Sequence, residues 1–382
     1  MLRCSQTAWL SPVPDRPLFP ARRAHLDRLT GPLGIWQHAR GIEPDRAFGT
    51  CTDDVARALM VDLLQRRTLG WEAVSPTARQ SMAFLAAAFD TSVGSFRNFR
   101  SADGEWLDEA PSQDSQGRAL LALGTAAKDA PEVALLVDAQ SLFAAALPGA
   151  MRLTSPRAIA SAVLGCEAAL AAGMTGETQR TFALLAGRLR SAFSELDLDG
   201  DWPWPEETLT YENALLPHAL IVAGRRLGDT RLRSVGLHVL DWLIAVQTSR
   251  RGIFTPIGSD GWWTRGMTRS QFDQQPIEAT AMILAASTAY ETTQDAGYLR
   301  SAEAAYAWFL GDNDAGLVIA DVLTGGCHDG LSEDHVNVNQ GAESTLMWLT
   351  ALETMRQLRT SAMAARQAPA RGGVPVLVEL RA

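Results

Sequence analysis

The apolar and polar residues alternate mostly with the period of an α-helix, and they form two kinds of segment. Segments of the first kind carry an apolar stripe and a charged face, as in TARQSMAFLAAAFD (77–90) and ETQRTFALLAGRLRSAF (177–193). Segments of the second kind begin with a polar group of residues and continue apolar on all sides, as in SPRAIASAVLGCEAALAA (155–172). The first pattern predicts helices with one solvent-exposed side, and the second predicts buried helices.

The two kinds of segment alternate six times, which predicts a ring. The buried segments start near residues 52, 114, 155, 211, 275 and 339. Six inner helices surrounded by six outer ones form an all-α (α/α)6 toroid, or barrel, and an open α-solenoid is the alternative. We favour the closed ring because six units fit it and neither end shows a capping repeat. The stretch AHLDRLTGPLGIWQHA (24–39) is expected to be the first of the solvent-exposed helices.

We expect one barrel domain over residues 22–358, an irregular segment over 1–21 and a flexible C-terminal tail over 359–382. The tail contains VPVLVEL, read as part of a tag-like extension or as an edge strand. Parallel inner helices direct their N-termini to one face, where the loops are long: about 90–113, 197–210, 249–274 and 312–338. Short β-hairpins are expected in these loops, for example in GLVIADVLTGG. Long polar loops on a rigid scaffold are where sites are usually built.

The composition excludes several functional classes. The net charge is −9 and the pI about 5.3, so the basic surface of a nucleic-acid-binding protein is absent. The four cysteines lie far apart and form no zinc motif, which favours free thiols in a reducing compartment. No apolar signal segment or membrane span is visible, so we expect a cytoplasmic protein. No motif requires a metal or another cofactor.

Carboxyl groups recur near the starts of the buried segments. Asp53, Asp54, Glu278 and Glu343 lie at such starts, and Glu207 lies shortly before another. Cleavage of a glycosidic bond commonly uses two carboxyl groups: one protonates the leaving oxygen, and the other activates water or attacks directly. We rank Asp54, Glu343 and Glu207 first as catalytic candidates, followed by Asp53 and Glu278. The sequence does not assign acid and base among them.

Amides, an arginine and aromatic rings accompany these acids, and together they are typical of a sugar site. Amides and carboxylates bind hydroxyl groups, and indole rings stack on the apolar face of a pyranose. The expected substrate-binding residues are Trp106, Trp202, Trp204, Trp263, Gln116, Arg157, Tyr211, Asn213, Gln275, His335, Asn339 and Gln340. Asp114, Glu206, Glu212 and Gln274 belong to the same polar groups but are not ranked.

Each of these signals also has a structural explanation. Acids in the first turn of a helix are favoured by the helix dipole, which would account for Asp53 and Asp54. The loop DGDWPWPEE (199–207) could be packed by its own tryptophans, and Arg57, Arg118 and Arg157 could simply pair with nearby acids. The acidic stretch DGLSED (329–334) lacks calcium-loop spacing and is expected to be a solvated loop. Repetition at six helix starts favours the functional interpretation.

With these residues in hand, the chain resembles the six-hairpin, (α/α)6-barrel carbohydrate-active enzymes. The motifs CTDDVARAL, DSQGRALLALG, WPWPEETLTYENALLPHAL, FDQQPIEA, TGGCHDGL and VNVNQGAEST look like those of a bacterial group often found beside, or fused to, glycosyltransferases. The likeness covers about residues 22–358. It implies an (α/α)6 fold, action on a glycan substrate with inversion, and a glycosyltransferase of the same pathway as a partner.

Several functions remain open at this stage. The leading hypothesis is an inverting glycoside hydrolase acting on an oligo- or polysaccharide. An inverting glycoside phosphorylase would use phosphate in place of the base, held by Arg57, Arg118, Arg157 or His335. A sugar epimerase or isomerase would need a histidine pair, which the six histidines do not obviously supply. A non-catalytic glycan-binding module linked to a glycosyltransferase is the fourth alternative.

Overall fold

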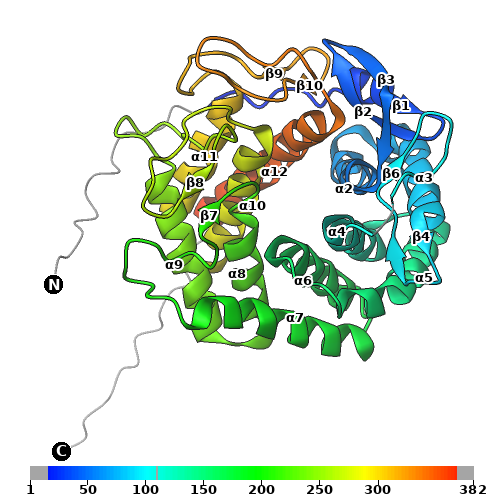
Figure 1. Ribbon diagram of the computed structural model, residues 1–382, viewed down its shortest axis with the longest axis horizontal. Helices are drawn as coiled ribbons and strands as arrows, with labels where there is room; N and C mark the ends of the chain where they lie inside the picture. The colour runs from blue at the N-terminus through cyan, green and yellow to red at the C-terminus, as the bar shows by residue number, and fades with distance from the viewer. Residues whose placement is uncertain (1–15, 109–110, 368–382) are drawn as a thin grey trace, which may run out of the picture.

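The inner helices form a closed ring. The computed structural model describes residues 16–108 and 111–367, and Figure 1 views the ring along its axis. The six inner helices of this part of the chain are α2 (Thr52–Leu69), α4 (Gln113–Asp129), α6 (Pro156–Ala171), α8 (Leu215–Leu227), α10 (Pro276–Thr293) and α12 (Ala342–Gln367). Each packs against the next, and α12 packs against α2. The prediction of a toroid is therefore confirmed, and the open solenoid is excluded.

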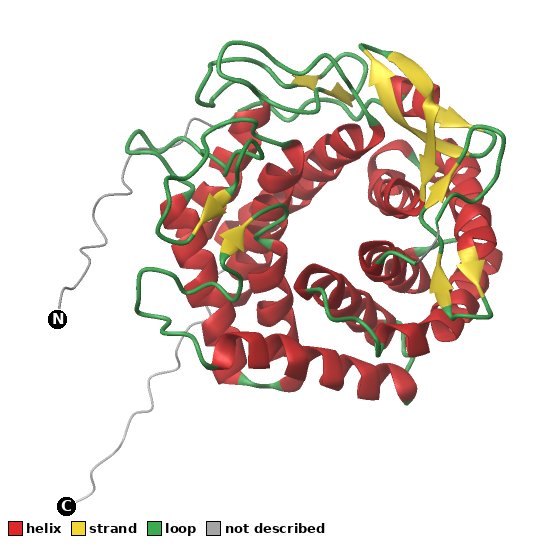
Figure 2. Cartoon of the chain, viewed as in Figure 1, coloured by secondary structure: helices red, strands yellow, loops and turns green. Residues whose placement is uncertain are grey.

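Five long helices surround this ring. They are α3 (Trp71–Ala88), α5 (Val133–Ala150), α7 (Glu177–Ser194), α9 (Thr230–Val246) and α11 (Ala296–Phe309), and each follows an inner helix after a short connection. Figure 2 shows that the helices make up the wall of the ring and that the strands lie in the loops of one face. The outer helix α5 is long and apolar enough to cross a membrane, with a mean hydropathy of 1.5. Its Leu135, Ala139 and Phe143 are nevertheless buried in the barrel core.

The inner helices approach closely because small residues line their contacts. A Cβ atom on Gly124 of α4 would lie 2.1 Å from the carbonyl oxygen of Gly165 on α6. A Cβ on Gly165 would in turn lie 2.4 Å from the carbonyl oxygen of Leu120. Real Cβ atoms do not come so near to backbone oxygens, so only glycine permits this spacing. The small, apolar composition of the inner segments is thus what the tight ring requires.

The sequence interpretation of residues 24–39 as one helix is wrong. Helix α1 covers only Ala24–Leu29, and the chain continues as β1 (Thr30–Gly31) and β2 (Gly34–Arg40). Pro32 cannot donate a backbone hydrogen bond, and Gly34 has a φ of +125°, so the helix cannot continue through this stretch. Strands β3 (Glu43–Cys51) and β6 (Phe99–Arg100) complete an antiparallel sheet of order β1-β2-β3-β6. This sheet leads directly into α2.

The expectation of short hairpins in the loops is confirmed. They pair β4 (Phe89–Asp90) with β5 (Ser95–Phe96), β7 (Thr208–Leu209) with β8 (Trp263–Thr264), and β9 (Ala320–Asp321) with β10 (Gly326–Cys327). The last of these hairpins lies in the GLVIADVLTGG stretch.

The expected tail boundary at residue 359 is too early. Helix α12 continues to Gln367, because this end of the helix still has packing partners. The Arg359 guanidinium donates to both carboxylate oxygens of Glu303 on α11, and Ala362 is buried. At the other end of the chain, residues 16–23 form neither helix nor strand. The stretch VPVLVEL and residues 1–15 lie outside the described residues.

Candidate active site

Side chains from the first turns of the inner helices meet at one end of the ring. A chain of contacts joins Glu343 of α12 to Arg57 of α2, and Asp53 of α2 to Arg118 of α4. A second chain joins Arg157 of α6 to Asn213, which precedes α8, and Asn213 to Glu278 of α10. All six inner helices therefore direct their N-termini to the same face. We call the residues in these contacts the N-terminal cluster, together with the residues that pair with their arginines: Asp54, Asp114, Glu206, Tyr211 and Glu212.

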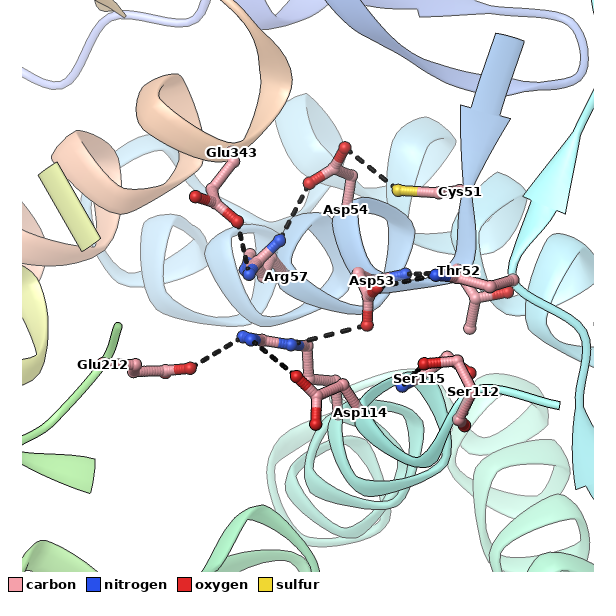
Figure 3. Close-up of polar contacts among 12 residues, drawn as sticks. Cys51, Thr52, Asp53, Asp54, Arg57, Ser112, Asp114, Ser115, Glu212 and Glu343 are labelled. Atoms are coloured by element: carbon pink, nitrogen blue, oxygen red, sulfur yellow. Dashed lines mark hydrogen bonds and ion pairs between the residues drawn. The ribbon is translucent and has the colours of Figure 1, made fainter. Parts of the chain in front are cut away.

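Arg57 bridges two carboxylates on neighbouring helices. Its Nη1 donates to Asp54 Oδ1 at 2.9 Å, and its Nη2 lies 2.7 Å from Glu343 Oε2 (Figure 3). The Cys51 thiol donates to the second oxygen of Asp54 at 3.1 Å. Burial raises the pKa of Asp54 to about 6, with Arg57 opposing the change and the Glu343 charge adding to it. Asp54 is only 4% exposed, whereas the Glu343 side chain is 41% exposed.

Arg118 gathers three carboxylates from three parts of the chain. Its Nη1 lies 3.0 Å from Glu212 Oε2, its Nε lies 3.4 Å from Asp53 Oδ1, and its Nη2 lies 3.9 Å from Asp114 Oδ2. Burial disfavours the charged guanidinium, but these acids and Glu343 outweigh burial, so the pKa of Arg118 is raised. Figure 3 shows Glu212 reaching the cluster from the side opposite to Asp53. Arg118 thus holds Glu212 against the α2–α4 wall.

The segment just before α8 is held by Glu278 of α10 and by Arg157 of α6. Glu278 Oε1 accepts the Glu212 backbone N–H, and its Oε2 accepts a bond from Asn213 Nδ2 at 3.0 Å. Arg157 donates to the Tyr211 carbonyl at 2.5 Å, and its guanidinium lies 4.7 Å from the centre of the Tyr211 ring. The Tyr211 hydroxyl donates to Asp114 at 2.6 Å. Burial and this bond to Asp114 raise the pKa of Tyr211.

A polar group at the start of α12 lies beside Glu343. Asn339 accepts the Ala39 backbone N–H with its Oδ1, so its amide nitrogen faces His38 Nδ1 and Asp329. Ser344 donates to the other oxygen of Asp329 at 2.7 Å. Burial raises the pKa of Asp329, although its hydrogen bonds oppose the rise. The expectation of a solvated loop is therefore wrong at Asp329, because Ser344 and Asn339 hold its carboxylate against α12.

The cluster combines solvent-accessible carboxylates with buried arginines. The side chains of Asp53, Asp114, Glu206, Glu212 and Glu343 are between 14% and 41% exposed. Those of Arg57, Arg118 and Arg157 are between 5% and 10% exposed. The arginines are therefore more deeply buried than the carboxylates that they bind, and a ligand would contact the carboxylates first.

Many of the residues selected from the sequence are brought together. Asp53, Asp54, Glu278, Glu343, Arg157, Tyr211 and Asn213 all belong to the N-terminal cluster, and Asn339 lies beside it. The sequence ranking omitted Arg118 as a central residue and preferred Glu207 to Glu212. Glu207 is exposed, and among the described residues its side chain makes no hydrogen bond or ion pair. The YEN sequence before α8 was the available signal for Glu212.

The predicted tryptophan platform is wrong for Trp202 and Trp204, because both rings are buried. Trp202 and Trp204 are buried and, with Trp263, pack around Trp242 of the outer helix α9. The Trp202 indole nitrogen donates to the Glu206 carbonyl, which fixes the loop beside Arg157. Trp202 and Trp204 pack the loop against the barrel and are not free to stack on a sugar, whereas Trp263 is half-buried and stacks on Trp242. Trp106 is half-buried, packs edge-on against Phe84 of α3 and lies against the Arg100 guanidinium.

The predicted carboxamides differ in their positions. Gln116 is buried and bonds the Phe96 N–H and the Ala146 carbonyl, and Gln340 is buried, with its backbone carbonyl bonded to His25, so neither side chain faces solvent. Gln275 is half-buried at the start of α10, and its amide makes no hydrogen bond among the described residues. His335 lies in an exposed loop next to Asp334. Gln275 therefore remains a candidate for substrate contact.

Comparison with known proteins identifies the fold. No family model matches the chain, and no curated protein matches it. A sugar epimerase from a ruminal bacterium has a similar structure, with a TM-score of 0.66 and 13% identity over 85% of this chain and 92% of that chain. A D-mannose isomerase also has a similar structure, with a TM-score of 0.65 and 13% identity over 86% of this chain and 91% of that chain.

A third similar structure is a glycan complex. It is an inactive variant of an α-1,6-mannanase from Salegentibacter sp., with two adjacent aspartates replaced by alanine, bound to α-1,6-mannotetrose. It gives a TM-score of 0.60 and 10% identity over 88% of this chain and 96% of that chain. At such identities the three likenesses establish the (α/α)6-barrel fold.

Proposed function

We propose that this protein is a carbohydrate-active enzyme that hydrolyses a glycosidic bond in an oligo- or polysaccharide, with inversion of the anomeric centre. The observation that carries the proposal is the N-terminal cluster, where acids from separate helices meet around buried arginines. The fold adds support, because similar structures are described as a sugar epimerase, a mannose isomerase and a mannanase. The mannanase variant is inactive without two adjacent aspartates, and this chain also has such a pair in Asp53 and Asp54.

We assign the acid–base pair to Glu343 and Glu212. They come from different elements, α12 and the segment before α8, and each is held by one arginine at its carboxylate end. The Glu343 side chain is 41% exposed and that of Glu212 is 14% exposed, and Arg118 is within range of the charge of each. In an inverting reaction one carboxyl group protonates the leaving oxygen while the other removes a proton from water on the opposite face of the sugar. The pair thus provides the two groups that the reaction needs.

Asp54 acts through Arg57 in this proposal. Both of its oxygens are engaged, by Arg57 and by the Cys51 thiol, and it is too buried to meet a glycosidic oxygen. Arg57 pairs with both Asp54 and Glu343, so the ionisation of Asp54 changes how strongly Arg57 binds Glu343. Asp54 is therefore a positioning residue, whereas Asp53, whose side chain is 19% exposed, pairs with Arg118.

A panel of glycans tests the proposal directly. Purified protein is incubated with α- and β-linked gluco-, manno- and galacto-oligosaccharides, with and without inorganic phosphate, and the first anomer formed is read by NMR. Phosphate-independent release of a sugar with inverted anomeric configuration is the expected result. Strict dependence on phosphate would show a phosphorylase, and retention of configuration would contradict the single-step mechanism. Glycan binding without turnover of any panel member would indicate a binding module.

One observation favours a second candidate, a sugar epimerase or isomerase. His38 lies against Asn339 beside Asp329, and His328 bonds the Asn337 carbonyl in the same loop, so two histidines lie near the start of α12. Histidines of this kind can move a proton at a carbon next to a carbonyl. The test is incubation of free mannose and cellobiose in deuterated water. Deuterium at the sugar C2 without bond cleavage would favour this second function over hydrolysis.

A further inference from the structure

The backbone at Glu212 is held in an unusual conformation. Glu212 has a φ of +50°, one of three non-glycine residues with positive φ among those that the structure describes. Such a conformation is costly for a residue with a side chain and persists only where the surroundings enforce it. It directs the Tyr211 and Glu212 side chains toward α4, where they meet Asp114 and Arg118. The question is which group enforces it.

Glu278 makes the contacts that would enforce the backbone conformation of Glu212. It is 2% exposed, and its two oxygens accept the Glu212 backbone N–H and a bond from Asn213 Nδ2. Asn213 in turn bonds the Thr210 carbonyl at 2.7 Å and accepts from Arg157 at 3.2 Å. A carboxylate can accept on both oxygens, which is what these two donors require. The buried Glu278 thus fastens the 210–213 turn from the α10 side.

We propose that Glu278 is a positioning residue, which holds the 210–213 turn so that Glu212 and Tyr211 face α4. Glu278 does not touch substrate, because the turn covers it. Its effect on catalysis is transmitted through the orientation of the Glu212 carboxylate, so this inference rests on the proposed function for its kinetic part. The placement of Tyr211 gives a structural readout that does not depend on any activity.

The Glu278→Gln variant tests the inference with almost no change of shape. A glutamine can accept from the Glu212 N–H but then presents its own NH₂ to the Asn213 NH₂, so one of the two contacts is lost. The protein is labelled with ¹³C at the tyrosine Cζ, and the Tyr211 signal is assigned with Tyr211→Phe. Only four tyrosines are present, so the signals can be separated. In Glu278→Gln we expect the Tyr211 signal to shift, because the phenol no longer keeps its place against Asp114.

A matched control separates this effect from the loss of any buried carboxylate. Glu353 is also buried on an inner helix, but it bonds Thr68 at the C-terminal end of α2, away from the cluster. Glu353→Gln should leave the Tyr211 signal unchanged. If Glu278→Gln does not fold, Glu278→Asp serves instead, because its shorter side chain keeps the charge but cannot reach both donors. A Tyr211 signal identical to that of the wild type in the folded variant would overturn the inference.

The kinetic arm depends on a substrate from the glycan panel. We expect Glu278→Gln to lower kcat at least tenfold with KM changed less than threefold, and to displace the limb of the pH–rate profile that Glu212→Gln abolishes. Unchanged kcat and pH profile would show that the turn does not position a catalytic group. If no glycan is cleaved, the proposed function fails, while the position of the Tyr211 signal still decides whether Glu278 holds the turn.

Discussion

Replacement of Glu278 by glutamine should change how the stability of the barrel depends on pH. Burial raises the pKa of Glu278 from 4.5 to about 7, although bonds from Asn213 and Glu212 oppose the rise. The folded state therefore binds more protons than the unfolded state between these values, and the stability of the wild type falls as pH rises through this range. At 1.36 kcal/mol per pKa unit, the full effect is about 3 kcal/mol. Most of it, about 2–3 kcal/mol, develops between pH 5 and pH 8.

The glutamine side chain does not titrate, so the variant lacks this fall in stability between pH 5 and pH 8. It also loses one buried hydrogen bond, which costs about 1–3 kcal/mol at every pH. The difference in unfolding free energy, variant minus wild type, should therefore start negative at pH 5 and rise by about 2–3 kcal/mol by pH 8. Urea denaturation at intervals of half a pH unit measures this difference. A difference that stays constant with pH would refute the claim that Glu278 is protonated more readily in the folded protein.

The remaining predictions concern catalysis and packing. Glu343→Gln should lower kcat by about 10²–10⁴-fold, the range for loss of a general acid or base, with the melting temperature unchanged; a variant with full turnover would remove Glu343 from the mechanism. Trp204→Ala should cost about 3–5 kcal/mol in urea denaturation and leave KM unchanged, whereas a large KM effect with unchanged stability would restore its role in sugar stacking. Gly124→Ala should destabilise by about 1–3 kcal/mol, because its Cβ would meet Gly165. Gly187→Ala, with open space around it, should stabilise by about 0.5–1 kcal/mol, and equal effects at the two glycines would contradict the close packing of α4 and α6.

Helix identity and order could be predicted from the sequence because both depend on local patterns. Amphipathic segments indicate outer helices with one face in solvent, and fully apolar segments indicate buried inner helices. Six such pairs fit a closed ring. The same reasoning failed at residues 24–39, where the apolar spacing continues but Pro32 and Gly34 interrupt the helix. It also placed the end of α12 too early, because the contact of Arg359 with Glu303 is not visible in the chain.

The sequence by itself determined that acids would gather at one end of the ring, because parallel helices bring their first turns together. Only the tertiary structure decided which of those acids face outward and which are enclosed. Trp202 and Trp204 resembled a sugar platform until their contact with Trp242 was known, and Glu207 resembled Glu212 until Arg118 was seen to hold only the latter. Direction of a side chain depends on loop paths and on partners distant in the chain, whereas helix starts depend on neighbours within a few residues.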